Sequence, residues 1–327
     1  MARELLRIRI DTLGRKRSLR LWGAMGRRRA SYAAIQRLTR RREAPAAAVA
    51  PRLGLALGGG FARGIAHAGV LKVFERHGIP IHCITGVSAG SIVAAAYASG
   101  TSPDEIARVG CSMRFRDVAR WTICRMGFMG SDRMKRFLEG VLKTGRFEDM
   151  RIPLGILATD LCTGEAVSFR DSGDVFLPVR ASCAYPGLFQ PVRAGDRLLV
   201  DGAMSVEIPA RLACELGATH VISVSLPPPP CLRPPADVFQ VVRRCFQIMQ
   251  RHSESVWRNA SNLVLTPDLE GIEWNAFEAG AEIVNAGEAA AIAALPVIRS
   301  WFLSPDLGAE RSAGLANEQI SPGELRS

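Results

Sequence analysis

Between residues 53 and 98 the hydrophobic pattern alternates between two kinds of segment. Short apolar runs at 53–57 and 81–85 are each followed by glycines, which predicts buried strands that end in turns. After each run, apolar residues recur at helical spacing and predict helices at 65–77 and 91–98. This alternation of strand and helix indicates right-handed crossovers and a parallel sheet, as in α/β proteins.

The pattern beyond residue 100 continues this mixture. Residues 103–150 are predicted to be mostly helical, with Ser131 or Asp132 as the N-cap of a helix at 133–142. Strands are predicted at 154–159, 166–169, 197–200 and 220–225, and helices at 209–216, 238–259 and 277–294. The proline-rich segment 226–235 suits neither a helix nor a central strand, so we expect an exposed loop.

Composition and charge divide the chain into three parts. Of its 327 residues 48% are hydrophobic, which is enough for a large core. The net charge of +11 lies entirely in residues 1–43, where 13 Arg and one Lys face three acidic residues. We therefore expect a basic arm and linker at 1–50, a folded domain at 51–302 and a polar tail at 303–327.

The basic arm has several interpretations. It can be a solvated tail, or it can contact an anionic membrane surface through residues 1–43. An arginine-rich, acid-poor arm also matches a mitochondrial presequence. A nucleic-acid partner is not expected, because the basic excess is confined to the arm and aromatic residues beyond Trp22 and Tyr32 are missing from it.

Cysteine spacing and hydropathy bear on the compartment. The eight cysteines form no Cys-x-x-Cys pair, and no cluster of Asp, Glu or His has ligand spacing, so neither a metal nor another cofactor is expected. No run of about 18 uninterrupted apolar residues predicts a membrane span, and arginines interrupt any secretory signal core. The expectation is a cytoplasmic protein, with peripheral membrane attachment through the arm as an option.

The segment Gly86-Val87-Ser88-Ala89-Gly90 has the pattern G-x-S-x-G between a predicted strand and a predicted helix. This setting exposes a serine Oγ, and the flanking glycines allow the tight turn. The amide dipoles of the following helix would favour a developing negative charge. On its own the pattern does not distinguish a nucleophile from an ordinary glycine turn.

A second glycine-rich loop, at 58–64, also joins a predicted strand to a predicted helix. It lacks the Gly-Lys-Ser/Thr of a P-loop, and Arg63 occupies the place of the third glycine in G-x-G-x-x-G. Its backbone amides could instead form an oxyanion hole. A glycine loop and a serine elbow on neighbouring strands are what ester hydrolysis requires.

The partner of Ser88 is less clear from the residues alone. His220 and His252 follow Asp201 in the chain, but neither lies in a predicted loop, and His67 is expected to pack or cap beside the glycine loop. Asp201 ends a predicted strand before Gly202-Ala203, although Asp-Gly is also a common turn dipeptide. Asp160 ends another predicted strand and is the rival carboxylate.

Four motifs occur in the order that is typical of one family. They are GGGFARGIAHAGVL at 58–71, GVSAG at 86–90, ASCAYPGLFQP at 181–191 and DGA at 201–203. Over roughly residues 52–300 the chain resembles a bacterial-type patatin-like phospholipase, and ATDLCTGEAVSF and IVNAGEAA are similar to recurring phrases of that family. The resemblance implies a three-layer α/β/α fold around a mainly parallel sheet, with a helical insertion near the active site.

The resemblance also implies roles for individual residues. Ser88 would be the nucleophile and Asp201 its proton acceptor, in a dyad without histidine. The backbone of Gly58, Gly59, Gly60 and Phe61 would form the oxyanion hole. Residues implied to support this site are Arg63, Gly64, Gly86, Gly90, Gly202 and Ala203. Phe61 departs from the glycine that many members have there, and its side chain is expected to narrow or reshape the entrance for the acyl group.

The function that follows is a serine lipid acyl hydrolase acting on phospholipid or lysophospholipid through an acyl-enzyme. One alternative is a lipid transacylase with the same site, and another is a non-catalytic lipid-binding or regulatory protein. The segment 103–150 mixes arginines with apolar residues, which suits either core helices or an apolar lid over an acyl groove. Its apolar positions are Met113, Phe115, Trp121, Ile123, Met126, Phe128, Met129, Met134 and Phe137.

Overall fold

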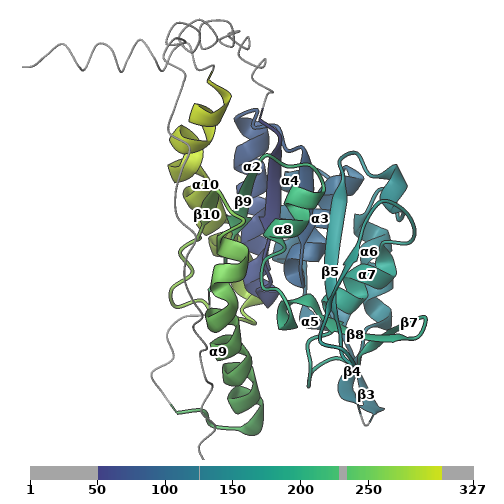
Figure 1. The fold of residues 1–327 in the computed structure, drawn as a ribbon. Coiled ribbons are helices and arrows are strands. Elements are labelled where there is room, and N and C mark those ends of the chain that lie inside the picture. Colours follow the sequence, from purple (N-terminus) through teal and green to yellow (C-terminus); the bar gives the residue numbers. More distant parts are fainter. Residues whose placement is uncertain (1–50, 125, 228–233, 304–327) are drawn as a thin grey trace, which may run out of the picture. The chain divides into compact units, whose positions relative to one another are not determined.

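An eight-stranded sheet forms the centre of the computed structural model, which describes residues 51–303 except 125 and 228–233 (Figure 1). The expectations for the arm at 1–50, for most of the proline-rich loop and for the tail from 304 concern residues outside this description. The strands of the sheet are β1 (Leu53–Leu57), β2 (Cys83–Gly86), β5 (Leu154–Asp160), β6 (Ala166–Phe169), β7 (Val192–Ala194), β8 (Arg197–Asp201), β9 (His220–Val224) and β10 (Leu263–Leu265).

The strand order is β10-β9-β1-β2-β5-β8-β7, and β6 pairs with β5. The neighbours from β10 to β5 are all parallel, whereas β6 and β8 run antiparallel to β5 and β7 runs antiparallel to β8. The predicted mainly parallel sheet is therefore confirmed. Every residue of β1, β2 and β5 is buried, as expected for central parallel strands covered on both faces.

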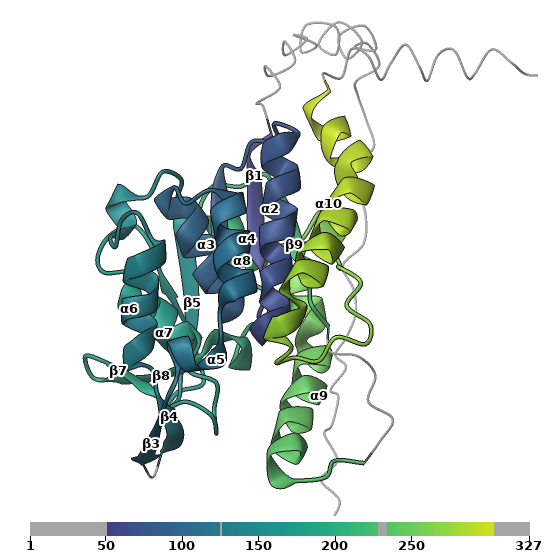
Figure 2. The same cartoon turned by 180° about the vertical axis from the view of Figure 1, so that it is seen from behind.

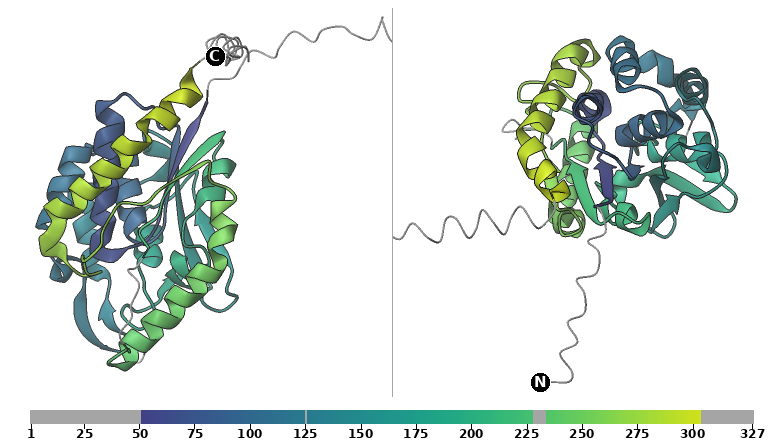
Figure 3. Two further views of the ribbon diagram at one scale, coloured as in Figure 1. Left: turned by 90° about the vertical axis from the view of Figure 1, so that its left-hand side faces the viewer. Right: turned by 90° about the horizontal axis from the view of Figure 1, so that it is seen from above.

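Helices cover both faces of the sheet (Figures 2 and 3). One layer contains α2 (Ala66–Arg76), α3 (Ala89–Ser99), α4 (Pro103–Ser112), α6 (Asp132–Val141), α7 (Phe176–Ser182) and α10 (Gly280–Phe302). The other contains α8 (Ala210–Glu215) and part of α9 (Val238–Arg258). Side chains of β1 alternate between the layers: Leu53, Leu55 and Leu57 join the large core, while Ala56 packs toward Trp257 of α9.

Two glycines bring the backbones of α2 and α10 into contact. A Cβ atom on Gly69 would lie 2.1 Å from Val284 O, and one on Gly287 would lie 2.0 Å from Ala66 O. Among the described helical segments, 277–302 is the one whose length and apolar character would suffice to cross a bilayer. It packs along α2 in the helical layer, and Glu288 of α10 pairs with Lys72 of α2 at 2.7 Å.

The insertion between α4 and β5 is only partly helical. It contains the short helix α5 (Phe115–Val118) and α6, but an antiparallel hairpin of β3 (Arg120–Cys124) and β4 (Gly127–Gly130) lies between them. The prediction of a mostly helical stretch was wrong at this point. Thr122 and Ile123 are β-branched and favour a strand, and Gly127 and Gly130 weaken a helix. Ser131 does occupy the N-cap position of α6.

Candidate active site

Ser88 lies in the sharp turn between β2 and α3, with φ +52° and ψ −127°. A non-glycine residue in this region carries backbone strain that the surrounding structure must hold in place. The glycines on either side permit the turn: a Cβ atom on Gly86 would lie 2.4 Å from Gly90 O, and one on Gly90 would lie 2.4 Å from Leu57 O. The Ser88 side chain therefore stands at the carboxyl end of β2, at the start of α3.

Asp201 at the end of β8 accepts a hydrogen bond from Ser88. The Ser88 Oγ to Asp201 Oδ2 distance is 2.7 Å, and the other carboxylate oxygen, Oδ1, accepts from the Ala203 amide at 2.9 Å. Gly202 permits this turn, since a Cβ atom there would lie 2.2 Å from Leu157 O. The structure thus brings together Ser88 and Asp201, the two residues that the sequence motifs indicated.

Burial dominates the electrostatics of this pair. Asp201 is 1% exposed, and burial raises the pKa of its carboxyl to about 7, although hydrogen bonds from Ala203 and Ser88 act to lower it. The neighbouring Cys183 thiol has a pKa raised by burial and by the nearby Asp201, and burial raises the pKa of Tyr185 to about 12. Near neutral pH, Asp201 is the group in this cluster that changes charge.

Two further serines hold the turn, and the sequence motifs assigned no role to either. Ser182 at the end of α7 accepts from the Ser88 amide at 2.8 Å and donates to Leu157 O at 2.7 Å. Ser91 donates to Ser88 O at 2.6 Å. Ser182 lies within the ASCAYPGLFQP motif. The motif therefore pointed to this residue, but its role in holding the turn is seen only in the structure.

The glycine loop runs beside Ser88. A Cβ atom on Gly59 would lie 3.2 Å from the Cβ of Ser88. Within the described part of the chain, the amides of Gly59, Gly60 and Phe61 donate to no backbone carbonyl, so they are available to a ligand. Gly58 differs from the expectation that it contributes to the oxyanion hole: its amide donates to Val224 O at 3.1 Å, which commits it to the sheet.

His67 and Arg63 act on the shape of this loop. His67 Nε2 lies 2.8 Å from Gly58 O, and burial lowers the pKa of His67 to about 4, so the neutral ring donates to that carbonyl. This matches the expectation that His67 packs or caps beside the loop. The buried Arg63 donates through Nη2 to Pro227 O at 2.6 Å. This hydrogen bond connects the glycine loop to the segment that follows β9.

The other candidate partners of Ser88 lie elsewhere. Asp160 Oδ1 accepts from the Cys162 amide at 2.9 Å in the turn after β5, and its Oδ2 lies 3.9 Å from Arg197 Nε. The ring of His220 packs against Trp301, and His252 is an exposed residue of α9. In the described residues, no group of three or more His, Cys, Asp or Glu side chains could hold a metal ion.

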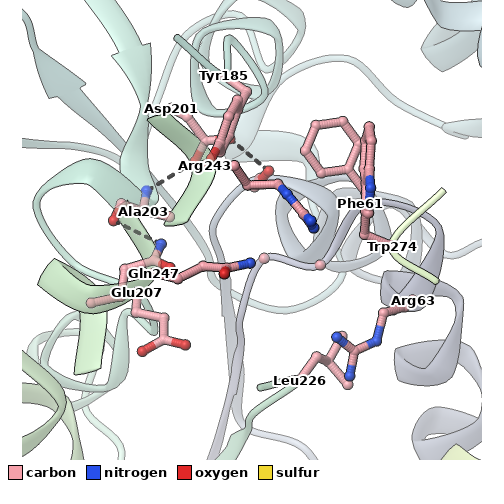
Figure 4. A pocket seen from close by; sticks show the side chains of 14 residues that line it. Phe61, Arg63, Tyr185, Asp201, Ala203, Glu207, Leu226, Arg243, Gln247 and Trp274 are labelled. Atoms are coloured by element: carbon pink, nitrogen blue, oxygen red, sulfur yellow. Dashed lines mark hydrogen bonds between the residues drawn. The ribbon is translucent and has the colours of Figure 1, made fainter. Parts of the chain in front are cut away.

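A pocket opens at the pair, with polar side chains on one wall (Figure 4). Arg243, Gln247 and Gln250 of α9 share one helix face that lines it, and Gln250 donates to Ala203 O at 3.3 Å. The Arg243 guanidinium lies 5.7 Å from the Trp274 ring centroid. No sequence motif pointed to these α9 residues, because they reach the site through tertiary packing.

Phe61 forms the opposite, apolar wall of this pocket. Its φ of +51° lies in the left-handed region, which a glycine would adopt without strain. The ring packs edge-on against Trp274 and Tyr185, with centroid distances of 4.8 and 5.5 Å. These aromatic contacts stabilise the conformation that the backbone disfavours.

Comparison with known proteins finds similarity to one family over the part of the chain that contains the site. Residues 55–214 match the model of the patatin-like phospholipase family, a range that contains Ser88 and Asp201. An uncharacterised NTE family protein of Mycobacterium tuberculosis is 34% identical over 179 residues, which cover 54% of this chain and 49% of the relative. A lysophospholipase of Debaryomyces hansenii is 31% identical over 182 residues, covering 53% of this chain and 12% of that protein.

The fold is also similar to a solved structure. VipD from Legionella pneumophila superposes with a TM-score of 0.54 at 11% identity, covering 76% of this chain and 67% of VipD. This supports the three-layer α/β/α fold. The chain spans about half or less of the length of the curated relatives described above, and α9 and α10 follow the range that matches the family.

Proposed function

We propose, from the match of residues 55–214 to the patatin-like phospholipase family, that this chain hydrolyses carboxylic esters of lipids with Ser88 as nucleophile and Asp201 as base. The observation that carries the proposal is the 2.7 Å hydrogen bond from a serine in a strained turn to a buried carboxylate whose pKa lies near 7. A general base is most effective when its pKa is close to the working pH.

The reaction begins with attack on the ester carbonyl. Asp201 accepts the Ser88 proton as Oγ bonds to the carbonyl carbon, and the amides of Gly59, Gly60 and Phe61 donate to the oxyanion. The bond to the alcohol then breaks, and the alcohol leaves with the proton from Asp201. Water gives a proton to Asp201 and attacks the acyl-serine, which releases the fatty acid and regenerates the Ser88 hydroxyl.

The direct test is fatty-acid release from lysophosphatidylcholine and from phosphatidylcholine by the purified chain. We expect turnover of at least one of these esters without added metal. Adding a long-chain alcohol separates hydrolysis from transacylation, because a transacylase would form the alkyl ester in preference to free acid. Absence of acyl transfer from either lipid, and from a water-soluble acyl ester, would contradict the proposal and favour a binding protein.

The pKa of Asp201 sets the expected pH dependence. Because the base must be ionised, kcat/KM should rise with pH up to about 7 and then level off. Below that value it should fall about tenfold per pH unit, as expected for one protonation. The measurement is a pH profile with an ester whose leaving alcohol does not ionise in this range. A flat profile between pH 5 and 8 would contradict a base with this pKa.

A further inference from the structure

Phe61 lines two apolar pockets in addition to the polar pocket. The first reaches Ser88 and is lined by apolar side chains of the insertion, among them Met113, Phe115 and Met134. The second lies between α3, α4 and α6 and is lined by side chains such as Ile92, Ala96 and Val109. The two pockets share Phe61, Ala89, Ile92 and Met113, so they meet along α3.

The polar pocket and the two apolar pockets differ sharply in the charge of their lining residues. Arg63, Glu207 and Arg243 line the polar pocket. Among the described residues that line the two apolar pockets, none is Asp, Glu, Lys, Arg or His. An ester substrate has the same asymmetry, because its acyl chain is apolar while the alcohol part of a phospholipid carries charge. Ser88 borders both sides, where the reacting carbonyl would have to lie.

We infer that the two apolar pockets form one channel for the fatty acyl chain, entered at Ser88 beneath Phe61 and directed along α3 toward Ala96. This inference rests on the proposed esterase function and adds the position and length of the acyl site. Ala96 follows Ser88 by eight residues, which corresponds to about 12 Å along a helix. A channel of that length suits a long acyl chain rather than an acetyl group.

Phe61 determines which way the substrate enters. Its ring lines the polar pocket and both apolar pockets, and it is held between Tyr185 and Trp274. The expectation that this side chain reshapes the acyl entrance thus gains a specific form: the ring separates the acyl side from the alcohol side. An acyl chain on the channel side would keep its apolar surface away from Arg243.

The test fills the channel and measures chain-length preference. Val109→Trp adds bulk from α4, and the matched control Arg108→Trp adds the same side chain at the neighbouring, exposed position. The readout is the ratio of kcat/KM for the palmitoyl and butyryl esters of one alcohol. Each methylene of the acyl chain that is buried should raise this ratio about fourfold. If Val109→Trp prevents two or more methylenes from being buried, the ratio should fall at least tenfold. Arg108→Trp should retain the wild-type ratio.

A second variant keeps the test decisive. Ala96→Leu narrows the channel from α3 and should also lower the ratio. An unchanged ratio in both folded variants would overturn the channel. Failure of both to fold, judged by thermal unfolding, would show that the space is already filled by packed core and would also overturn it.

Palmitate binding distinguishes failure of the channel from failure of the proposed function. Palmitate should raise the Tm of Ser88→Ala and should raise it much less when Val109→Trp is added, because ligand bound to the folded state stabilises it. If no ester is hydrolysed but palmitate shows this pattern, the channel stands and the esterase function fails. If esters are hydrolysed but palmitate raises neither Tm, the channel fails and the esterase function stands.

Discussion

Replacing Ser88 with alanine is expected to lower kcat/KM for ester hydrolysis by about 10⁵-fold, a loss typical of removing a serine nucleophile. Alanine keeps the backbone and the Cβ atom but removes the Oγ that donates to Asp201. The residual rate would come from the glycine-loop amides and from substrate binding alone. The measurement is fatty-acid release under single-substrate conditions, with thermal unfolding to show that the variant is folded.

Two companion variants make this result specific. Ser223→Ala removes the hydroxyl of another buried serine, which lies in β9 and hydrogen-bonds to Ser261, and should leave turnover nearly unchanged. Ser88→Gly should be as inactive as Ser88→Ala but more stable, because glycine adopts φ +52° without the strain of a Cβ atom. Substantial turnover by Ser88→Ala would rule out Ser88 as the nucleophile.

The local part of the site could be predicted from the sequence. The apolar run before Gly86 and the helical spacing after Gly90 predict a strand, a turn and a helix, and β2 and α3 have nearly the expected bounds. The glycines indicated tight turns, and the structure shows that the backbone there leaves no room for a Cβ atom. Asp201 could be placed at a strand end because the apolar run before it and the Gly202 after it predict a strand followed by a turn.

The rest depends on contacts that no local pattern encodes. Ser182 is 94 residues from Ser88, and Arg243 lies on a helix beyond the family's matched range. Gly58 looks like its neighbours in the sequence, but pairing of β1 with β9 directs its amide to Val224. The last helix was predicted at 277–294, whereas α10 continues through Pro296 to Phe302.

The second prediction with a large expected effect tests Asp201, rather than Asp160, as the base. Asp201→Asn should lower kcat/KM by about 10³-fold or more, within the range of acid–base catalysis and dyad loss. Its amide oxygen can keep the bond from Ala203, but its NH₂ group would then face Ser88 and donate to Oγ. The hydroxyl would lose its proton acceptor while the turn keeps its shape. Asp160→Asn is the matched control and should retain turnover, because the carboxyl of Asp160 bonds within its own turn.

The same substitution should have the opposite effect on stability. An unfolded Asp201 ionises near pH 3.8 and the folded one near 7, so the wild type loses stability as pH rises between these values. The difference corresponds to about 4 kcal/mol. Asparagine does not ionise, so at pH 8 Asp201→Asn should have a higher free energy of unfolding than the wild type, and the gap should close toward pH 4. Denaturant unfolding at pH 8 and pH 4 measures this difference in the free energy of unfolding.

A variant that is inactive and equally destabilised at both pH values would indicate a structural role for Asp201. Loss of activity with a gain in stability at high pH would instead indicate that the buried carboxylate costs the fold stability and serves the reaction.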